Sequence, residues 1–239
     1  MSRDLYPAMT AASASLQHLE HVSHNLANVN TSGFKERRIS FEAVLANAER
    51  GPLSQGYTQI TEGKINMESG SLIQDNNPTS FALEGKGFFV VQSATGEPLL
   101  TRAGIFQLDR NGFLVNAMGE KVMTVSGPIQ FDEYQREEFR VTEEGRLMDE
   151  RGGEFARLLI MDGDDLEPLA GTRWRASNMH EVPMGSYIVR QGMLETSNVN
   201  PFRTMIEMME TTRHFEMYQK SMQASKEMDS SLNSTAHRL

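Results

Sequence analysis

The sequence contains no cysteine, so disulfide bonds, thiolate catalysis and cysteine-ligated zinc are excluded. It also lacks any run approaching the ~18 apolar residues that a membrane-spanning helix needs. The first residues carry neither the basic stretch nor the continuous apolar run of a secretory signal peptide, and we expect no cleaved signal peptide. Basic residues are outnumbered, at 23 against 32 acidic ones, which gives a formal net charge of −9. Nucleic acid and anionic membranes are therefore not expected as partners, because their binding depends on clustered lysine and arginine.

The negative charge is concentrated in the middle of the chain. Residues 1–35 and residues 200–239 each carry equal numbers of acidic and basic side chains, whereas residues 36–199 hold 25 acidic and 16 basic ones. Self-repulsion keeps such a middle segment soluble and leaves the neutral ends free to associate. The total of 239 residues is enough for one or two domains.

Apolar residues near the N-terminus recur at steps of three and four, which is the period of an amphipathic helix or a coiled-coil seam. The pattern runs from Leu5 to Leu26 and predicts a helix over about residues 4–30. Alanine and serine at positions 11–15 permit close approach of another backbone. The asparagine-rich end of the pattern and the turn residues 31–33 are expected to terminate the helix.

The C-terminal segment has the same period over a greater length. Asn200 is a candidate N-cap placed directly before Pro201 at the first helical position. No glycine or proline follows Pro201, so one long helix is expected to about residue 235. Six of the sixteen methionines lie in this segment. Methionine is an adaptable side chain that suits a surface meeting several slightly different neighbours.

Between the two helical patterns the period changes to two and turn residues multiply, which indicates short antiparallel strands over residues 76–190. Asp109 to Gly112 predicts a hairpin turn between strands at 106–108 and 113–115. Residues 36–75 are interpreted as an irregular connector with a short helical piece near 40–47. The predicted fold class is α+β, in which long N- and C-terminal helices, paired like a coiled coil, flank a mainly antiparallel β domain. The expected parts are an axial helix and turn (1–35), the connector (36–75), an outer β domain (76–190), a return linker (191–199) and a second axial helix (200–239).

No group of residues indicates catalysis or a metal site. His18, His21 and His24 spread over the surface of the first helix, and no carboxylate pattern completes a site. Gly85 to Gly87 resembles half of a dinucleotide loop but no helix follows it. Asp162 to Asp165 lacks the register of a calcium loop and is interpreted as a hairpin turn. We therefore expect no enzyme activity, no cofactor and no small-molecule substrate.

Four blocks of residues, taken in order, resemble the bacterial flagellar rod and hook axial proteins. The first is Asn25 to Lys35 (NLANVNTSGFK), which is similar to the N-terminal signature of that family. The second is the FALEGKGFFV segment at 81–90. The third is LTRAGIF at 100–106 together with DRNGFLV at 109–115. The last is GMLETSNVN at 192–200, followed by a helix that contains RHFE at 213–216. The blocks span nearly the whole chain.

The resemblance implies a structural subunit of the flagellar basal-body rod, most like the proximal-rod members, with a distal-rod protein as the alternative. Such subunits polymerise helically through their terminal helices into the drive shaft that carries motor torque and supports motility. Their partners are other copies of themselves, other flagellar rod proteins and the flagellar export apparatus. The implied location is the basal body, in a rod that spans the periplasm, after type III export without a cleaved signal peptide. A flagellar export chaperone or adaptor and an envelope-remodelling hydrolase are the alternatives from other classes.

The two helical stripes are expected to form the assembly interface, because an isolated amphipathic helix gains stability mainly from packing against neighbours. The family motifs beside them are expected to set the angle between the helices and the β domain. The interface residues are Leu5, Met9, Leu16, Leu19, Leu26, Met205, Phe215, Met222, Met228 and Leu232. The hinge residues are Asn25, Asn28, Asn30, Gly33, Phe34, Asn198 and Asn200.

Overall fold

The computed structural model describes residues 5–38, 40–44, 57–61, 65–132 and 139–236, with side chains over 9–38, 65–132 and 139–228. The chain divides into two compact units. The first, here called the helical unit, comprises residues 1–28, 36–66 and 199–239. The second, here called the β unit, comprises residues 29–35 and 67–198.

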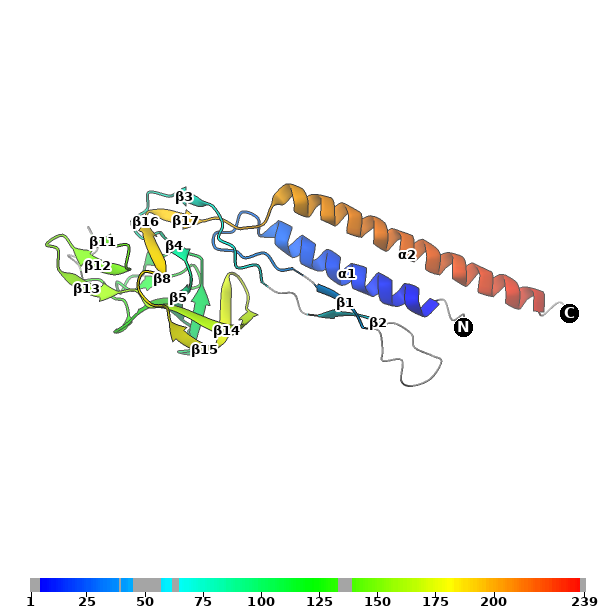
Figure 1. Cartoon of the computed structure of the whole chain (residues 1–239), viewed down its shortest axis with the longest axis horizontal. Helices are drawn as coiled ribbons and strands as arrows, with labels where there is room; N and C mark the ends of the chain where they lie inside the picture. Colours follow the sequence, from blue (N-terminus) through cyan, green and yellow to red (C-terminus); the bar gives the residue numbers. More distant parts are fainter. Residues whose placement is uncertain (1–4, 39, 45–56, 62–64, 133–138, 237–239) are drawn as a thin grey trace. The chain divides into compact units, whose positions relative to one another are not determined.

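Two helices and one hairpin make up the described part of the helical unit. Helix α1 (Leu5–Ala27) lies alongside helix α2 (Pro201–Ala236), as Figure 1 shows. Strand β1 (Ser40–Val44) pairs antiparallel with β2 (Tyr57–Thr61), and β2 packs against α1. The expected helical piece near 40–47 is therefore wrong over 40–44, and residues 45–47 lie outside the described residues. Pairing with β2 decides the conformation here, since strand formation depends strongly on context.

The β unit contains fifteen strands among its described residues. Those before residue 130 are β3 (Leu72–Gln74), β4 (Phe81–Gly85), β5 (Phe88–Gln92), β6 (Pro98–Thr101), β7 (Gln107–Leu108), β8 (Leu114–Val115), β9 (Lys121–Thr124) and β10 (Gly127–Pro128). The later ones are β11 (Phe139–Val141), β12 (Arg146–Asp149), β13 (Glu154–Arg157), β14 (Ile160–Pro168), β15 (Arg173–Glu181), β16 (Tyr187–Gln191) and β17 (Met193–Glu195).

The largest sheet of the β unit has eight strands in the order β14-β15-β6-β5-β9-β8-β7, with β10 paired to β9. Strand β14 also pairs with β5, so that β14, β15, β6 and β5 close a ring. The strands β11, β12 and β13 form a second sheet, and the pairs β16–β4 and β17–β3 form two more. All of these pairings are antiparallel.

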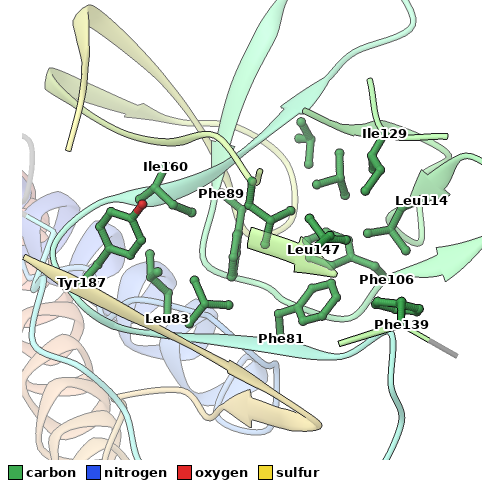
Figure 2. Packing of buried hydrophobic residues seen from close by; sticks show 14 of the residues in the cluster. Phe81, Leu83, Phe89, Phe106, Leu114, Ile129, Phe139, Leu147, Ile160 and Tyr187 are labelled. Atoms are coloured by element: carbon green, nitrogen blue, oxygen red, sulfur yellow. The ribbon is translucent and has the colours of Figure 1, made fainter. Parts of the chain in front are cut away.

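The core of the β unit is rich in phenylalanine. Figure 2 shows side chains from β4, β5, β12 and β16 converging with Phe106 and Phe139. The ring of Phe106 lies 6.0 Å from that of Phe81 and 5.7 Å from that of Phe89, the second pair edge to face. Such tilted and edge-to-face pairs add stability beyond the area they bury. The segments at 81–91 and 99–115, identified from the sequence as strands, supply much of this core.

The predicted hairpin at residues 109–112 is confirmed. Strand β7 pairs with β8, and the Asp109 Oδ1 atom accepts hydrogen bonds from the backbone nitrogens of Asn111 (2.9 Å) and Phe113 (2.8 Å). Gly85 and Gly87, which the sequence placed in a loop-like segment, form a bend between β4 and β5, with φ of +94° at both. The two strands it joins do not pair with each other: β4 pairs with β16, whereas β5 pairs with β6, β9 and β14.

The interpretation of Asp162 to Asp165 as a hairpin turn is wrong. These residues lie inside the nine-residue strand β14, whose register against β15 shifts on both sides of Asp164. Asp165 has φ of +46°. An irregular strand of this kind bends locally without reversing direction, which explains why a cluster of turn-forming residues occurs within it.

The predicted fold class, in which two long helices paired like a coiled coil flank a β domain, is also wrong. The described residues form two helices and seventeen strands, and the N-terminal helix is short, at 23 residues against 36 for α2. A coiled coil requires apolar side chains inserted between its helices. Met9, Leu16 and Met205 are exposed instead, and the buried positions are held by small or polar residues such as Ala12 and Thr204.

Candidate assembly interface

Small and polar side chains form the contact between α1 and α2. Ala12, Ala14 and Val22 of α1 are buried, as are Thr204 and Thr211 of α2. Each buried threonine hydroxyl donates to the carbonyl oxygen four residues earlier in its own helix, at 2.9 Å and 2.8 Å. These hydroxyls therefore need no hydrogen-bond partner on α1. Both threonines can be buried against α1 without leaving a polar group unsatisfied.

A hollow open to solvent lies between the two helices. Its volume is about 460 Å³. It is lined by Ala11, Ala14, Ser15 and His18 of α1 and by Glu207, Glu210, Thr211, His214 and Tyr218 of α2. His18 Nε2 lies 3.2 Å from Glu207 Oε1 at its edge. No group of three or more histidine, aspartate or glutamate side chains in the described residues could hold a metal ion.

The ten predicted interface residues do not all share one face. Met9, Leu16, Met205 and Met228 are exposed, whereas Leu19, Leu26, Phe215 and Met222 are half-buried. The side chains of Leu5 and Leu232 lie outside the described residues. The exposed members are available to a neighbouring molecule, and the half-buried members contribute to the packing of the helical unit itself.

Helix α2 carries a second apolar face, of which the predicted interface residues include Met205. Phe202 is 78% exposed, and Met205, Ile206, Met209 and Met217 are also exposed. At 100° per residue, Phe202, Ile206 and Met209 lie on the side of the helix opposite Thr204 and Thr211. Neighbouring exposed apolar residues of this kind are typical of interaction surfaces. Its signal in the sequence was the run of large apolar residues at 202, 205, 206 and 209.

Three of the predicted hinge asparagines act on the backbone at the helix ends. Asn25 is buried and binds the backbone of Arg37 twice: its Nδ2 donates to the carbonyl oxygen at 2.8 Å, and its Oδ1 accepts from the nitrogen at 3.1 Å. Asn28 Nδ2 donates to the His24 carbonyl oxygen at 2.8 Å. Asn200 caps α2, because its Oδ1 accepts from the Arg203 nitrogen at 3.1 Å.

The hinge residues of the β unit lie where two distant segments meet. Gly33 has φ of +70°, and a Cβ atom added there would lie 2.3 Å from the backbone nitrogen of Ala103. Its own nitrogen donates to the Glu195 carbonyl oxygen at 2.8 Å. Phe34 is buried, and Asn198 Nδ2 donates to the Glu68 carbonyl oxygen at 2.9 Å. Asn30 is exposed.

A buried group of charges beside Gly33 escaped the sequence reasoning. Lys35 Nζ lies 2.7 Å from Glu195 Oε1, and the side chains of both residues are 1% exposed. Arg102 Nη1 lies 3.5 Å from Glu195 Oε2 and donates to the Leu83 carbonyl oxygen at 2.8 Å. These three residues, here called the ion cluster, come from three of the four family blocks. Their positions within those blocks were the feature of the sequence that could have identified the ion cluster.

Backbone groups complete the ion cluster. The Gly70 nitrogen donates to Glu195 Oε1 at 2.9 Å, and Lys35 Nζ donates to the Glu68 carbonyl oxygen at 2.8 Å. Burial lowers the pKa of Lys35 below its ordinary value of 10.5, against the opposing effect of its hydrogen bond to Glu195. Burial likewise lowers the pKa of Arg102. Glu195 thus holds residues 33–35 and residues 68–70 to the last strand of the β unit.

The described helices give no indication of a membrane segment, since neither combines the length and the apolarity needed to cross a bilayer.

Comparison with known proteins identifies the class to which this architecture belongs. A family model described as flagella basal body rod protein matches residues 5–35. The flagellar hook protein FlgE/F/G D1 domain matches residues 82–153. The flagellar basal body rod FlgEFG protein C-terminal model matches residues 190–235. The three matches follow the chain in order and cover both helices and the centre of the β unit.

Individual relatives agree with these matches. The flagellar basal-body rod protein FlgG of Buchnera aphidicola (subspecies Schizaphis graminum) is 28% identical over 254 residues, covering 95% of this chain and 97% of the relative. FlgF of Escherichia coli K12 is 29% identical over 236 residues, covering 92% of each chain. FlgF of Rhizobium meliloti is 29% identical over 224 residues, covering 90% of each. The chain belongs to the family of flagellar basal-body rod proteins. The export-chaperone alternative is not supported by any of these names.

Proposed function

We propose that this chain is a structural subunit of the flagellar basal-body rod that joins its neighbours through the exposed faces of α1 and α2. The observation that carries the proposal is the apolar face of α2, where Phe202, Ile206 and Met209 are exposed although other apolar residues of the same helix are half-buried. Exposed apolar surface of this kind costs free energy until a partner covers it. Membership of the rod family supplies the class of partner, namely other rod subunits.

The finer points of the assignment are proposals from the same family likeness. We place the chain in the proximal rod, which the family resemblance favours, and keep the distal rod as the alternative, because relatives named FlgF and relatives named FlgG are similar to it at nearly equal identity. We further propose export through the flagellum's own apparatus without a cleaved signal peptide, and a position in the rod that crosses the periplasm. In this account the chain is not an enzyme, and it uses no nucleic acid, cofactor or small-molecule substrate.

A mechanical role is proposed for the hinge residues. Gly33 permits a close approach of two backbones, and Asn25, Asn198 and Asn200 each bind backbone atoms near a point where the chain passes between its units. Residues that fix the backbone at such points determine how torque applied to one unit reaches the other. The ion cluster, which lies beside Gly33, supports this role by resisting separation of the joined segments.

The proposal is tested by placing a charge on the exposed face of α2. Ile206→Asp removes an exposed apolar contact without opening the α1–α2 packing, and it should abolish incorporation into the rod. Met118→Asp is the matched control, because Met118 is equally exposed but lies in the β unit. Mass spectrometry of purified basal bodies measures both variants against the parent chain. Normal incorporation of Ile206→Asp would contradict the assignment of the interface.

A further inference from the structure

A small pocket in the helical unit is lined by several basic side chains. Its volume is about 150 Å³, and its lining includes Arg37, Arg38 and Arg203. His18 and His21 of α1 also line it, and the acidic side chains in its lining are Glu36 and Glu207. Among the described residues, the lining therefore has three guanidinium groups and two imidazoles beside two carboxylates.

Both carboxylates of the pocket already have partners within the helical unit. Glu36 Oε2 accepts from Arg38 Nε at 2.8 Å and from Asn66 Nδ2 at 3.1 Å. Glu207 Oε1 lies 3.2 Å from His18 Nε2. In the part of the chain that the structure describes, neither Arg37 nor Arg203 forms an ion pair. With neutral imidazoles the described lining carries three positive and two negative charges, and its two unpaired arginines are Arg37 and Arg203.

Arg37 is fixed in place rather than loosely exposed. The two hydrogen bonds between Asn25 and the Arg37 backbone, one in each direction, hold it in place, and an isolated bridge pairs Arg37 with Ile65. The residue is half-buried, and burial lowers the pKa of its guanidinium. Its charge also helps to lower the pKa values of His21 and His24, after the larger effect of their own burial. A partly desolvated cation on a fixed backbone is suited to binding an anion, because little order is lost when the anion binds.

We propose that the pocket around Arg37 binds a carboxylate side chain of a second copy of this chain. Arginine presents paired donors that match the two oxygens of a carboxylate, and a pocket of this size admits one such group. The partner is chosen by charge: the β unit holds 21 acidic and 13 basic residues, whereas the helical unit holds 11 and 10. The β unit of a neighbouring copy therefore offers a large excess of carboxylates, whereas the helical unit that holds the pocket is nearly neutral. The inference deepens the proposed function, because it names a polar contact between rod subunits.

The first test measures binding of acetate, the simplest carboxylate, to the full chain. The ring protons of His21 are followed by NMR as a function of pH in sodium acetate and in sodium chloride of equal ionic strength. We expect the pKa of His21 to be higher in acetate, because a bound anion offsets the charge of Arg37. The difference should vanish in Arg37→Gln and persist in Arg110→Gln, which changes an exposed arginine in the β7–β8 turn. Equal pKa values in the two salts would overturn the proposal.

The second test measures self-association of the full chain by sedimentation velocity. Arg37→Glu should weaken association about tenfold, because it places like charges together. Arg110→Glu, with the same net charge, should not. A parent chain that remains monomeric at about 1 mM, or one whose association is unchanged by Arg37→Glu, would overturn the assignment to a second copy. Circular dichroism verifies that both variants retain their helices.

Recovery in basal bodies separates this inference from the proposed function. If the parent chain is found there and Arg37→Glu is found equally, the carboxylate contact is wrong and the rod assignment stands. If Arg37→Glu is lost although its self-association is normal, the pocket faces a different rod protein and the second-copy assignment is wrong. If the parent chain itself is absent, the proposed function fails whatever the acetate titration shows.

Discussion

Removing the amino group of Lys35 is the perturbation whose effect the structure defines best. In Lys35→Met the side chain keeps an apolar stem of similar size but loses the Nζ atom, which lies 2.7 Å from Glu195 Oε1 and 2.8 Å from the Glu68 carbonyl oxygen. Glu195 then stays buried with Gly70 and the more distant Arg102 as its remaining partners. Breaking a buried ion pair by removing one member costs about 3–5 kcal/mol. Because Arg102 still offsets part of the charge, we expect about 3 kcal/mol.

Urea unfolding of the full chain, followed by fluorescence, measures this loss. Trp174 is the sole tryptophan of the sequence and is buried in the β unit, with its ring 5.3 Å from that of Phe88, so its emission reports on that unit. With a slope of about 2 kcal/mol per molar urea, the midpoint of the transition should fall by about 1.5 M. Glu143→Gln is the control, because it breaks an exposed pair with Arg190 and should leave the midpoint unchanged.

A double-mutant cycle then distinguishes the ion pair from general packing. Lys35→Met and Glu195→Gln should together cost less than the sum of the single changes, by at least about 1 kcal/mol. A midpoint for Lys35→Met within about 0.5 M of the parent would refute the reasoning. Strict additivity in the cycle would show that the two side chains act separately, which the 2.7 Å contact does not allow.

Three further changes test other parts of the structure. Gly33→Ala should destabilise the β unit by more than the roughly 1–3 kcal/mol that a left-handed backbone alone costs. Gly96→Ala is the control in the same urea assay, because Gly96 has φ of +84° but open space around it. Equal losses of stability in the two variants would show that the close approach at Gly33 is unimportant. Asn200→Ala removes the cap of α2 and should cost about 0.5–2 kcal/mol, seen as reduced helical ellipticity on heating, and an unchanged melting curve would count against the cap. The pKa values of His21 and His24 are lowered below 6.5 in the folded chain, so the unfolded chain binds their protons more readily, and the stability of the helical unit should fall as the pH drops below about 6.5. Replacing both histidines by glutamine should flatten this pH dependence, and an unchanged slope of stability against pH would contradict the role given to the two histidines.

Local patterns in the sequence predicted those elements whose residues interact with close neighbours. Both helices were placed correctly within a few residues, because period and capping are short-range signals: Asn200 and Pro201 mark the start of α2 directly. The hairpin at Asp109 to Gly112 was likewise predictable, because a single aspartate carboxylate organises the turn. The hairpin of β1 and β2 was not, since each strand is stabilised by the other, across a segment with no clear period.

The pairing of the helices and the ion cluster depended on contacts that no local pattern shows. No local pattern in the sequence shows that Ala12 and Thr204 are buried in the helical unit while Met9 and Leu16, two of the predicted assembly-interface residues, are exposed. Lys35 and Glu195 are 160 positions apart in the chain, and Arg102 is 93 positions from Glu195. Each looks like an ordinary surface charge in the sequence. Only the folded backbone, with Gly33 against Ala103, brings the three together.

The central claim, that this chain is a rod subunit assembled through its helices, is tested most directly by mass spectrometry of purified flagellar basal bodies. The measurement compares strains that carry the full chain with strains in which residues 200–239 have been removed. The account predicts the full-length protein in stoichiometric amounts with the other rod components, and its loss on truncation. Absence of the full-length protein from clean basal bodies, or normal incorporation of the truncated chain, would contradict it.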